Sequence, residues 1–337
     1  MEDPMAEVIQ VGCIGCGGRG RLYTSGLAKL PGFRMRGYAD ARIEAAKAFQ
    51  EAYGGDYATT DLNRVLEDPD IGVVLICTYH DTHAPLSIKA AEQGKHILLE
   101  KPMALTIEEC EAIERAVEKA GVRMALGFKM RFMPVIAKVR EKIGTPMMMV
   151  GQMMDKRWAD TNWAQQPKIG GGNVISQGCH TTNILTYFAG ADPVSVYAEG
   201  GPMTHTGTDI IDNVVATIRY KNGVVASMIQ GDAGLNPHVS KFFFELFGKD
   251  GKGAGLYNRC HEATLWGADV DRIGPETLTP QENEDIEGDQ GLLRHFAECV
   301  KENRPTLVGP REGRVATTIV VKIFEAVRTG KPQKIEV

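Results

Sequence analysis

The chain has 337 residues, of which 43% are hydrophobic and 24% are charged, and its formal net charge is −5. This is the composition of a globular protein that is long enough for two domains. The negative charge argues against a nucleic-acid partner, and no apolar run approaches the length that spans a membrane. Seven cysteines, an odd number scattered along the chain, fit reduced thiols better than a disulfide framework. The acidic N-terminus shows no secretory signal, so we expect a cytoplasmic protein.

An apolar run at residues 8–14 leads into a glycine-rich turn. The turn has the pattern G-x-G-x-x-G and consists of Gly15, Cys16, Gly17, Gly18, Arg19 and Gly20. Gly15 permits a tight turn, Gly17 lets the backbone approach a pyrophosphate, and Gly20 lets the next helix pack on the strand. The unpaired N–H groups at the start of that helix would then bind the phosphates. A strand-turn-helix without a ligand is the alternative interpretation.

The acidic residue expected in such a unit follows at the right spacing. A helix containing Leu22 and Leu27 ends at Pro31, and a second strand at residues 33–38 leads to Asp40, which is 20 residues after Gly20. About 20 residues is the usual spacing for a carboxylate that binds the ribose hydroxyls of NAD. A carboxylate repels the 2′-phosphate of NADP, so the sequence favours NAD. Arg42 could accommodate that phosphate, which leaves NADP as the alternative.

Strands and helices alternate over the next hundred residues. We expect helices at residues 62–67, 84–93 and 106–120, and strands at residues 72–77, 96–99 and 122–126. Alternation of this kind predicts right-handed crossovers and a doubly wound parallel sheet. The sequence therefore predicts an α/β protein whose first domain, residues 1–127, is an NAD(P)-binding Rossmann domain.

The pattern changes after residue 127. Strand-like segments follow one another at residues 147–154, 194–198, 213–220, 224–230 and 242–247, and helices are expected near residues 292–302 and 312–328. Residues 128–337 are therefore expected to form an α+β domain with a large, mostly antiparallel or mixed sheet, which binds substrate. The sequence shows no helical layer for the second face of this sheet, so we expect a homodimer or homotetramer.

Three further motifs give the chain a family resemblance. They are Glu100-Lys101-Pro102 after a strand, the segment T-Y-H-D-T-H at residues 78–83, and the run G-G-G-N-V-I-S-Q-G-C-H at residues 170–180. With the glycine turn, they make the chain resemble the glucose-fructose oxidoreductase and inositol dehydrogenase (Gfo/Idh/MocA) family along both domains. The resemblance implies an NAD(P)-dependent oxidoreductase that acts on a secondary alcohol of a sugar, a polyol or a sugar derivative.

The resemblance also implies roles for individual residues. Lys101 would contact the nicotinamide ribose and the substrate hydroxyl, after a peptide that is often cis before Pro102, and His180 would be the general base. Histidine has a pKa suited to removing a proton at neutral pH, and a lysine cation can polarise the same oxygen. The other expected cofactor contacts, from two strand ends, are Thr78, Tyr79, His80, His83 and Glu100.

The substrate is expected to contact residues of both domains. Besides Lys101 and His180, the expected set is Lys129, Arg131, Trp158, Trp163, Ser176 and Gln177. Relatives commonly carry an aspartate four residues before the histidine, where this chain has Ser176. A serine hydroxyl can hydrogen-bond a sugar but cannot hold a charge, so His180 would lack the usual carboxylate partner unless Gln177 or Asp155 replaces it.

His80 and His83 are spaced like a pair of metal ligands, but no further ligand spacing completes a site, so no metal is expected. Two other functions stay open. The chain could be a glycosidase or lyase that oxidises a sugar transiently and recycles bound NAD, or a regulatory protein that senses a sugar or dinucleotide without turnover. The sequence identifies neither the sugar, nor the carbon that reacts, nor the physiological direction.

Overall fold

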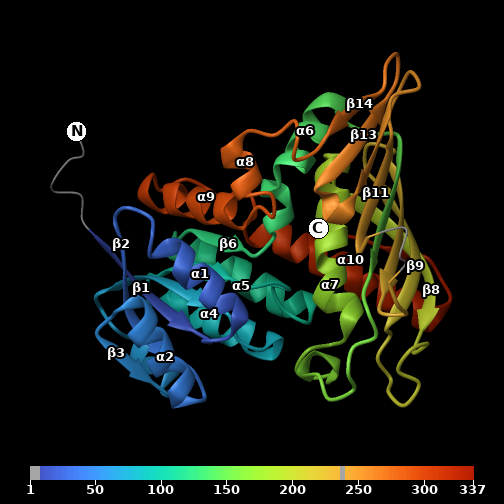
Figure 1. Ribbon diagram of the computed structural model, residues 1–337. Coiled ribbons are helices and arrows are strands. Elements are labelled where there is room, and N and C mark those ends of the chain that lie inside the picture. Colours follow the sequence, from blue (N-terminus) through green and yellow to red (C-terminus); the bar gives the residue numbers. More distant parts are fainter. Residues whose placement is uncertain (1–7, 236–239) are drawn as a thin grey trace. The chain divides into compact units, whose positions relative to one another are not determined.

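The computed structural model describes residues 8–235 and 240–337, which form two compact units. The first unit contains the chain up to Ala104, then Glu108–Gly127 and Leu292–Arg311. The second contains Leu105–Ile107, Phe128–Gly291 and Glu312–Val337. Each unit has its own sheet, shown in Figure 1.

The first unit is built on a six-stranded sheet in the order β3-β2-β1-β4-β5-β6, with every pair parallel. Its strands are β1 (Ile9–Ile14), β2 (Phe33–Ala39), β3 (Tyr57–Thr59), β4 (Ile71–Ile76), β5 (His96–Leu99) and β6 (Met124–Leu126). Its helices are α1 (Gly18–Leu27), α2 (Ile43–Tyr53), α3 (Leu62–Leu66), α4 (His83–Glu92), α5 (Ile107–Ala120) and, from near the end of the chain, most of α9 (Asp289–Lys301). The doubly wound parallel sheet expected from the sequence is confirmed.

The central strands of this sheet are buried on both faces, as is usual where helices cover a parallel sheet. In β4, Val73, Val74, Leu75 and Ile76 are all inaccessible to solvent. Ile14 at the end of β1 pairs with Ala39 of β2 and with Ile76 of β4, so the carboxyl ends of three strands are level. The loops after these strands therefore meet at one edge of the sheet, which is where ligands bind in open α/β sheets.

A segment from the end of the chain completes the first unit. The backbone N–H of Leu126 in β6 donates to the carbonyl of Val308 at 2.8 Å, and Lys301 Nζ donates to the carbonyl of Pro31 at 2.6 Å. Residues 292–311, which the sequence analysis placed with the second domain, thus lie in the first unit of the structure.

The second unit is built on a nine-stranded sheet in the order β14-β13-β12-β11-β7-β10-β9-β8-β15. Strands β7 and β10 are parallel and all other neighbours are antiparallel, which confirms a mostly antiparallel, mixed sheet. The strands predicted from the sequence are β7 (Met148–Met154), β8 (Pro193–Gly201), β9 (Asn213–Tyr220), β10 (Val225–Gly231) and β11 (Phe242–Phe247). The sequence did not predict β12 (Gly253–Tyr257), β13 (Glu262–Trp266), β14 (Asp271–Ile273) or β15 (Gln333–Lys334).

The described helices of this unit lie on one face of its sheet, among them α6 (Pro134–Ile143), α7 (Asn173–Ala189) and α10 (Pro310–Thr329) (Figure 1). They share one hydrophobic core with the strands. Strand β9 shows the consequence, because Val214, Ala216 and Ile218 are buried while Val215 between them is 54% exposed. This alternation is typical of a strand with one covered and one open face.

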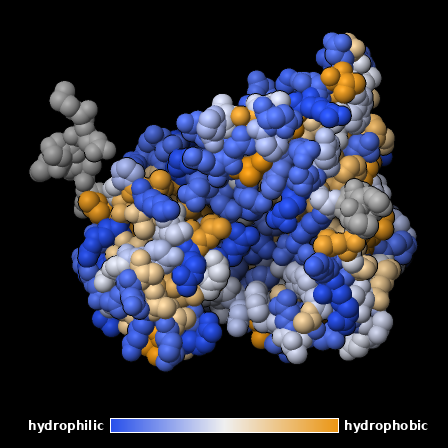
Figure 2. Space-filling view, viewed as in Figure 1, coloured by the Kyte–Doolittle hydropathy of each residue, from blue (hydrophilic) through white to orange (hydrophobic). Residues whose placement is uncertain are grey.

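No helix among the described residues has the length and apolarity that crossing a membrane requires. The face of the molecule in Figure 2 is largely hydrophilic, with apolar residues in small separate groups.

The core of the second unit gives a direct test of this packing. Phe244 on β11 is fully buried, and Gly151 on β7 leaves room for its ring beside Leu185 of α7. We expect Phe244→Ala to lower the free energy of unfolding by about 3–5 kcal/mol, because it removes a large buried ring and leaves a cavity. Val215→Ala in the same sheet deletes exposed methyl groups and is expected to change it by less than about 0.5 kcal/mol. Denaturant unfolding of both variants makes the comparison, and equal effects would contradict the assigned faces.

Candidate active site

The glycine turn between β1 and α1 is held by contacts that only glycine can make. Gly15 has a φ of +93°, and a Cβ on it would lie 2.4 Å from the carbonyl oxygen of Cys77. A Cβ on Gly20 would lie 2.1 Å from the carbonyl oxygen of Gly15. A Cβ on Gly17 or Gly18, by contrast, would meet no described atom within 4 Å. Gly15 and Gly20 thus shape the turn, and Gly17 and Gly18 present open backbone at the start of α1.

Asp40 lies directly beside this turn. One of its carboxylate oxygens accepts the backbone N–H of Cys16 at 2.8 Å, and the other accepts the backbone N–H of Arg42 at 2.9 Å. The guanidinium of Arg42 is 3.8 Å from the same carboxylate, and its side chain is 77% exposed. The carboxylate therefore lies at the ends of β1 and β2, where a ribose that follows the pyrophosphate would be bound.

The E-K-P motif follows β5 at the same edge of the sheet. The hydroxyl of Tyr23 in α1 donates to Glu100, whose other oxygen accepts the backbone N–H of Lys101 at 3.2 Å. Burial and the neighbouring Glu100 raise the pKa of Tyr23, so its hydroxyl keeps its proton for this bond. Gly127 is required here, because a Cβ on it would lie 2.6 Å from the Tyr23 oxygen. The peptide between Lys101 and Pro102 is cis.

His83 supports this motif from α4. Its Nδ1 lies 2.7 Å from the carbonyl oxygen of Pro102, and its Nε2 lies 3.3 Å from that of Thr78. Burial lowers the pKa of His83, so the ring is neutral at pH 7 and has one N–H. That N–H is assigned to Nδ1, which makes the shorter contact and donates to the Pro102 carbonyl. His80 is 5% exposed within a short 3₁₀ helix (His80–Thr82), and Tyr79 beside it is 52% exposed. His83, one of the expected cofactor contacts, thus lies against the backbone of the loops at Thr78 and Pro102.

In the second unit, α7 carries His180. Ser176, Gln177 and His180 lie three, four and seven residues after Asn173, which places the four on one face of the helix. Ser176 and His180 are 4% and 5% exposed, and the ring of His180 packs edge-on against Phe128 at 5.9 Å. The helix begins after Gly171 and Gly172, which both have positive φ angles.

A buried polar network fixes the start of α7. The side chain of Asn173 accepts from Gln230 Nε2 at 3.0 Å, and Gln230 Oε1 accepts from Thr181 at 2.9 Å. Asp155 at the end of β7 accepts from Lys241 Nζ at 2.6 Å and from Asn173 at 3.5 Å. The sequence analysis named Asp155 but missed Asn173, whose position seven residues before His180 was the available signal.

Two of the expected substrate residues, Lys129 and Arg131, form polar contacts with other residues of the second unit. Lys129 Nζ lies 2.7 Å from Glu287 and 2.9 Å from Asp289. Arg131 Nε donates to Asn183 at 2.9 Å, and its guanidinium lies over the ring of Tyr187. Burial lowers the pKa of Arg131 to about 10, so it is still charged at neutral pH. Their observed contacts stabilise the second unit.

The two tryptophans lie on the segment between β7 and α7. Trp158 is half-buried, with its backbone N–H bonded to Asp232 at 3.0 Å and its indole N–H to Asp155 at 3.3 Å. Trp163 begins a 3₁₀ helix, Trp163–Gln165, and is also half-buried. The indole of Trp158 is thus tied to the same carboxylate as the start of α7.

Comparison with known proteins identifies the family of both domains. Residues 9–128 match the family described as "Oxidoreductase family, NAD-binding Rossmann fold", and residues 137–337 match "Oxidoreductase family, C-terminal alpha/beta domain". The scyllo-inositol 2-dehydrogenase (NAD(+)) of Bacillus subtilis is 27% identical over 99% of this chain and 98% of its own length. The inositol 2-dehydrogenase of Rhizobium meliloti is 30% identical over 68% of this chain and 72% of its own.

A solved structure shows the same fold. Levoglucosan dehydrogenase in complex with NADH and levoglucosan superposes with a TM-score of 0.87 over 98% of this chain and 100% of that chain, at 24% identity. The first domain is thus an NAD-binding Rossmann domain, and the protein is an NAD(P)-dependent oxidoreductase. Both domains match along nearly their whole length, and the chain therefore belongs to the Gfo/Idh/MocA oxidoreductase family.

Proposed function

We propose that this enzyme transfers a hydride between NAD and a secondary alcohol of a sugar, a polyol such as an inositol, or a sugar derivative. The observation that carries the proposal is the E-K-P motif, where Glu100 bonds the backbone of a buried Lys101 at the ligand-binding edge of a Rossmann sheet. The relatives named dehydrogenases of inositols and levoglucosan support the substrate class.

The residues have separate tasks in this reaction. NAD, when bound, accepts the hydride from carbon. We assign Lys101 to hold the reacting hydroxyl and stabilise negative charge on its oxygen, and His180 to remove its proton. The backbone of Gly17 and Gly18 would bind the pyrophosphate, and the Asp40 carboxylate would bind the ribose hydroxyls. Arg42 beside Asp40 keeps NADP as the alternative cofactor.

One face of α7 supports a substrate with many hydroxyl groups. Ser176 and Gln177 offer a hydroxyl and an amide, which can donate to and accept from sugar hydroxyls, and the two tryptophans offer ring faces. We also propose a cytoplasmic location. We propose a homodimer or homotetramer as well, because exposed apolar residues such as Val215 lie on the open face of β9.

Ser176 favours a second candidate. Without a carboxylate at this position, a sugar could be oxidised by bound NAD, could eliminate a protonated substituent, and could be reduced again by the same NADH. This cycle alone gives a lyase, and addition of one water to the unsaturated sugar before the reduction gives a glycosidase. Such an enzyme would release product without a net change in NADH.

The first experiment supplies purified protein with NAD or NADP and a panel of inositols, anhydrosugars and sugars, and follows NADH fluorescence. We expect a rise with NAD and one compound class. Product release without a net fluorescence change would support the NAD-recycling candidate. Bound NAD and bound sugar without any product would contradict both enzymatic proposals and support a sensor.

Variants of the two proposed catalytic residues test the mechanism. We expect Lys101→Met to lower kcat by about 100- to 1,000-fold, because charge on the reacting oxygen loses its stabilising cation. His180→Asn is expected to lower kcat by about 100- to 10,000-fold, because the proton acceptor is removed. Lys47→Met, on an exposed position of α2, is the matched control. Full turnover by a folded Lys101→Met variant would overturn the mechanism.

Variants of the glycine turn can distinguish an effect on cofactor binding from an effect on folding. We expect Gly17→Ala to fold normally, because its Cβ meets no described atom within 4 Å, yet to bind NAD at least tenfold more weakly, because the methyl group would occupy the path of the pyrophosphate. Gly20→Ala should instead lower the melting temperature, since its Cβ would lie 2.1 Å from the Gly15 carbonyl oxygen. Calorimetric titration with NAD and thermal unfolding measure the two effects. Unchanged NAD affinity in Gly17→Ala would contradict the assigned phosphate site.

A further inference from the structure

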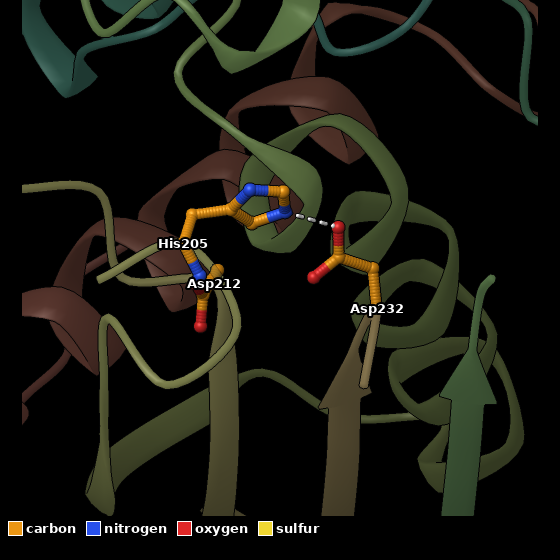
Figure 3. A group of neighbouring side chains, drawn as sticks. All are labelled: His205, Asp212 and Asp232. Carbon is orange, nitrogen blue, oxygen red and sulfur yellow. Dashed lines mark hydrogen bonds and ion pairs between the residues drawn. The ribbon is translucent and has the colours of Figure 1, made fainter. Parts of the chain in front are cut away.

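A second cluster of chemically active side chains lies in the second unit, at the strand ends of β9 and β10. His205, Asp212 and Asp232 are all buried, and their potential ligand atoms lie within 4.8 Å of one another. The three residues come from the loop before β9 and from the residue directly after β10, as Figure 3 shows. None of them is among the residues assigned to the oxidoreductase reaction.

The contacts at the centre of this cluster do not fit ordinary hydrogen bonding. His205 Nε2 lies 2.7 Å from Asp232 Oδ2 and 2.8 Å from Gln165 Nε2, and Gln165 Nε2 lies 3.2 Å from Asp232 Oδ2. If the imidazole nitrogen is protonated, two N–H donors face each other at 2.8 Å. If the Gln165 amide is rotated, its oxygen instead faces the Asp232 carboxylate. One proton therefore cannot satisfy all three contacts.

One carboxylate oxygen of the same cluster has no donor among the described residues. Asp232 is 0% exposed, and its Oδ1 makes no hydrogen bond, although Oδ2 accepts three. Figure 3 shows that the oxygen of Asp232 not bonded to His205 points into the space between the labelled side chains. A buried acceptor without a donor costs about 1–3 kcal/mol, and more when it is charged.

The surroundings of His205 are those of a histidine that binds a metal. Its other ring nitrogen, Nδ1, lies 2.7 Å from Asp160 Oδ1, and a carboxylate at that position fixes the ring orientation in many metal sites. Asp212 holds the loop, because its carboxylate accepts the backbone N–H groups of Met203, Thr204 and His205. With four donors in all, Asp212 has no remaining lone pair to offer, but it adds negative charge.

We propose that His205 Nε2, the carboxylate of Asp232 and the side-chain oxygen of Gln165 bind one divalent first-row transition cation. Adjacent ligands of an octahedral ion at about 2.1 Å lie about 3 Å apart. The three side chains are separated by 2.7, 2.8 and 3.2 Å, and the two distances to Gln165 Nε2 become distances to its oxygen when the amide is rotated by about 180°. The donors are one imidazole nitrogen and oxygens, without a thiolate, which suits Zn²⁺ or Mn²⁺. No metal-ligand spacing is visible in the sequence here, because Gln165, His205 and Asp232 come from three separate segments.

The bound cation would order the segment between β7 and α7. Trp158 donates its backbone N–H to Asp232, and Gln165 ends the short helix that begins with Trp163. Both tryptophans are proposed substrate contacts, so the cation would stabilise one wall of the substrate region without taking part in hydride transfer. The metal proposal is therefore independent of the proposed reaction, and its tests use no activity.

The ring would release a proton when the cation binds. Burial alone lowers the pKa of His205, but its hydrogen bonds to Asp232 and Asp160 outweigh this effect and raise the pKa above the usual value, while Arg157 opposes them. A protonated ring must lose its Nε2 proton to solvent before that nitrogen can bind a metal.

The test uses full-length protein without a histidine tag, treated with chelator and titrated with ZnCl₂ or MnCl₂. We expect one equivalent to bind per chain, and the melting temperature to rise with the free metal concentration. His205→Gln and Asp232→Asn should abolish this binding, and Asp160→Asn should weaken it about 10- to 100-fold. Asp209→Asn, an exposed aspartate of the same loop, is the matched control and should bind normally.

Metal binding can also be tested on the wild-type protein, so the test does not depend on whether the variants fold. Nitrogen-15 NMR of the His205 ring should show loss of the Nε2 proton when the metal is added. A ring that stays protonated at both nitrogens in the presence of either metal, with no rise in melting temperature, would overturn the proposal. Unchanged metal affinity in a folded Asp232→Asn variant would overturn it as well.

Discussion

The glycine turn of the proposed cofactor site depends on the close contact between Gly15 and the carbonyl of Cys77. These residues follow β1 and β4, the neighbouring strands between which the strand order reverses. A Cβ at Gly15 would lie 2.4 Å from that carbonyl oxygen, so any other residue would force the two strand ends apart. This contact places the turn before α1 beside Asp40. The Glu100-Lys101 motif follows β5 at the same edge of the sheet. Phosphate, ribose and nicotinamide contacts are thus expected from the loops after β1, β2 and β5, at one edge of the sheet.

In the second unit, α7 carries polar side chains that are nearly inaccessible to solvent and therefore need hydrogen-bond partners. Buried polar groups are costly without partners. Asn173 and Thr181 both bond to Gln230 of β10, so the register between helix and strand is set by hydrogen bonds as well as by the apolar core. This fixes the rotation of α7 about its axis, and therefore the face that carries Ser176 and His180. An uncharged Ser176 on that face leaves the Lys241 and Asp155 pair as the charged group at the start of the helix.

The sequence predicted the elements with strong local signals. Long apolar strands such as β4, and the spacing from Gly20 to Asp40, identify the Rossmann unit because its strands are buried and its turn needs glycine. The sequence did not predict β12 (Gly253–Tyr257), whose glycines carry little strand preference and whose pairing with β11 is a tertiary contact. The packing of residues 292–311 with the first unit, and the meeting of Gln165, His205 and Asp232, also join segments that are distant in the chain. The ion pairs of Lys129 could not be predicted either, because its acidic partners lie about 160 residues further along the chain.

The most direct test of hydride transfer follows deuterium. The protein is incubated with NAD and inositols or sugars that are deuterated at every ring carbon, and the masses of nucleotide and product are recorded with time. We predict that one substrate transfers a single deuterium to the nucleotide as deuteride, and that the reduced nucleotide accumulates in step with the ketone. Bound NAD that acquires no deuterium from any substrate, while that substrate is bound or converted, would contradict the central claim that this site moves a hydride between a sugar or polyol and NAD.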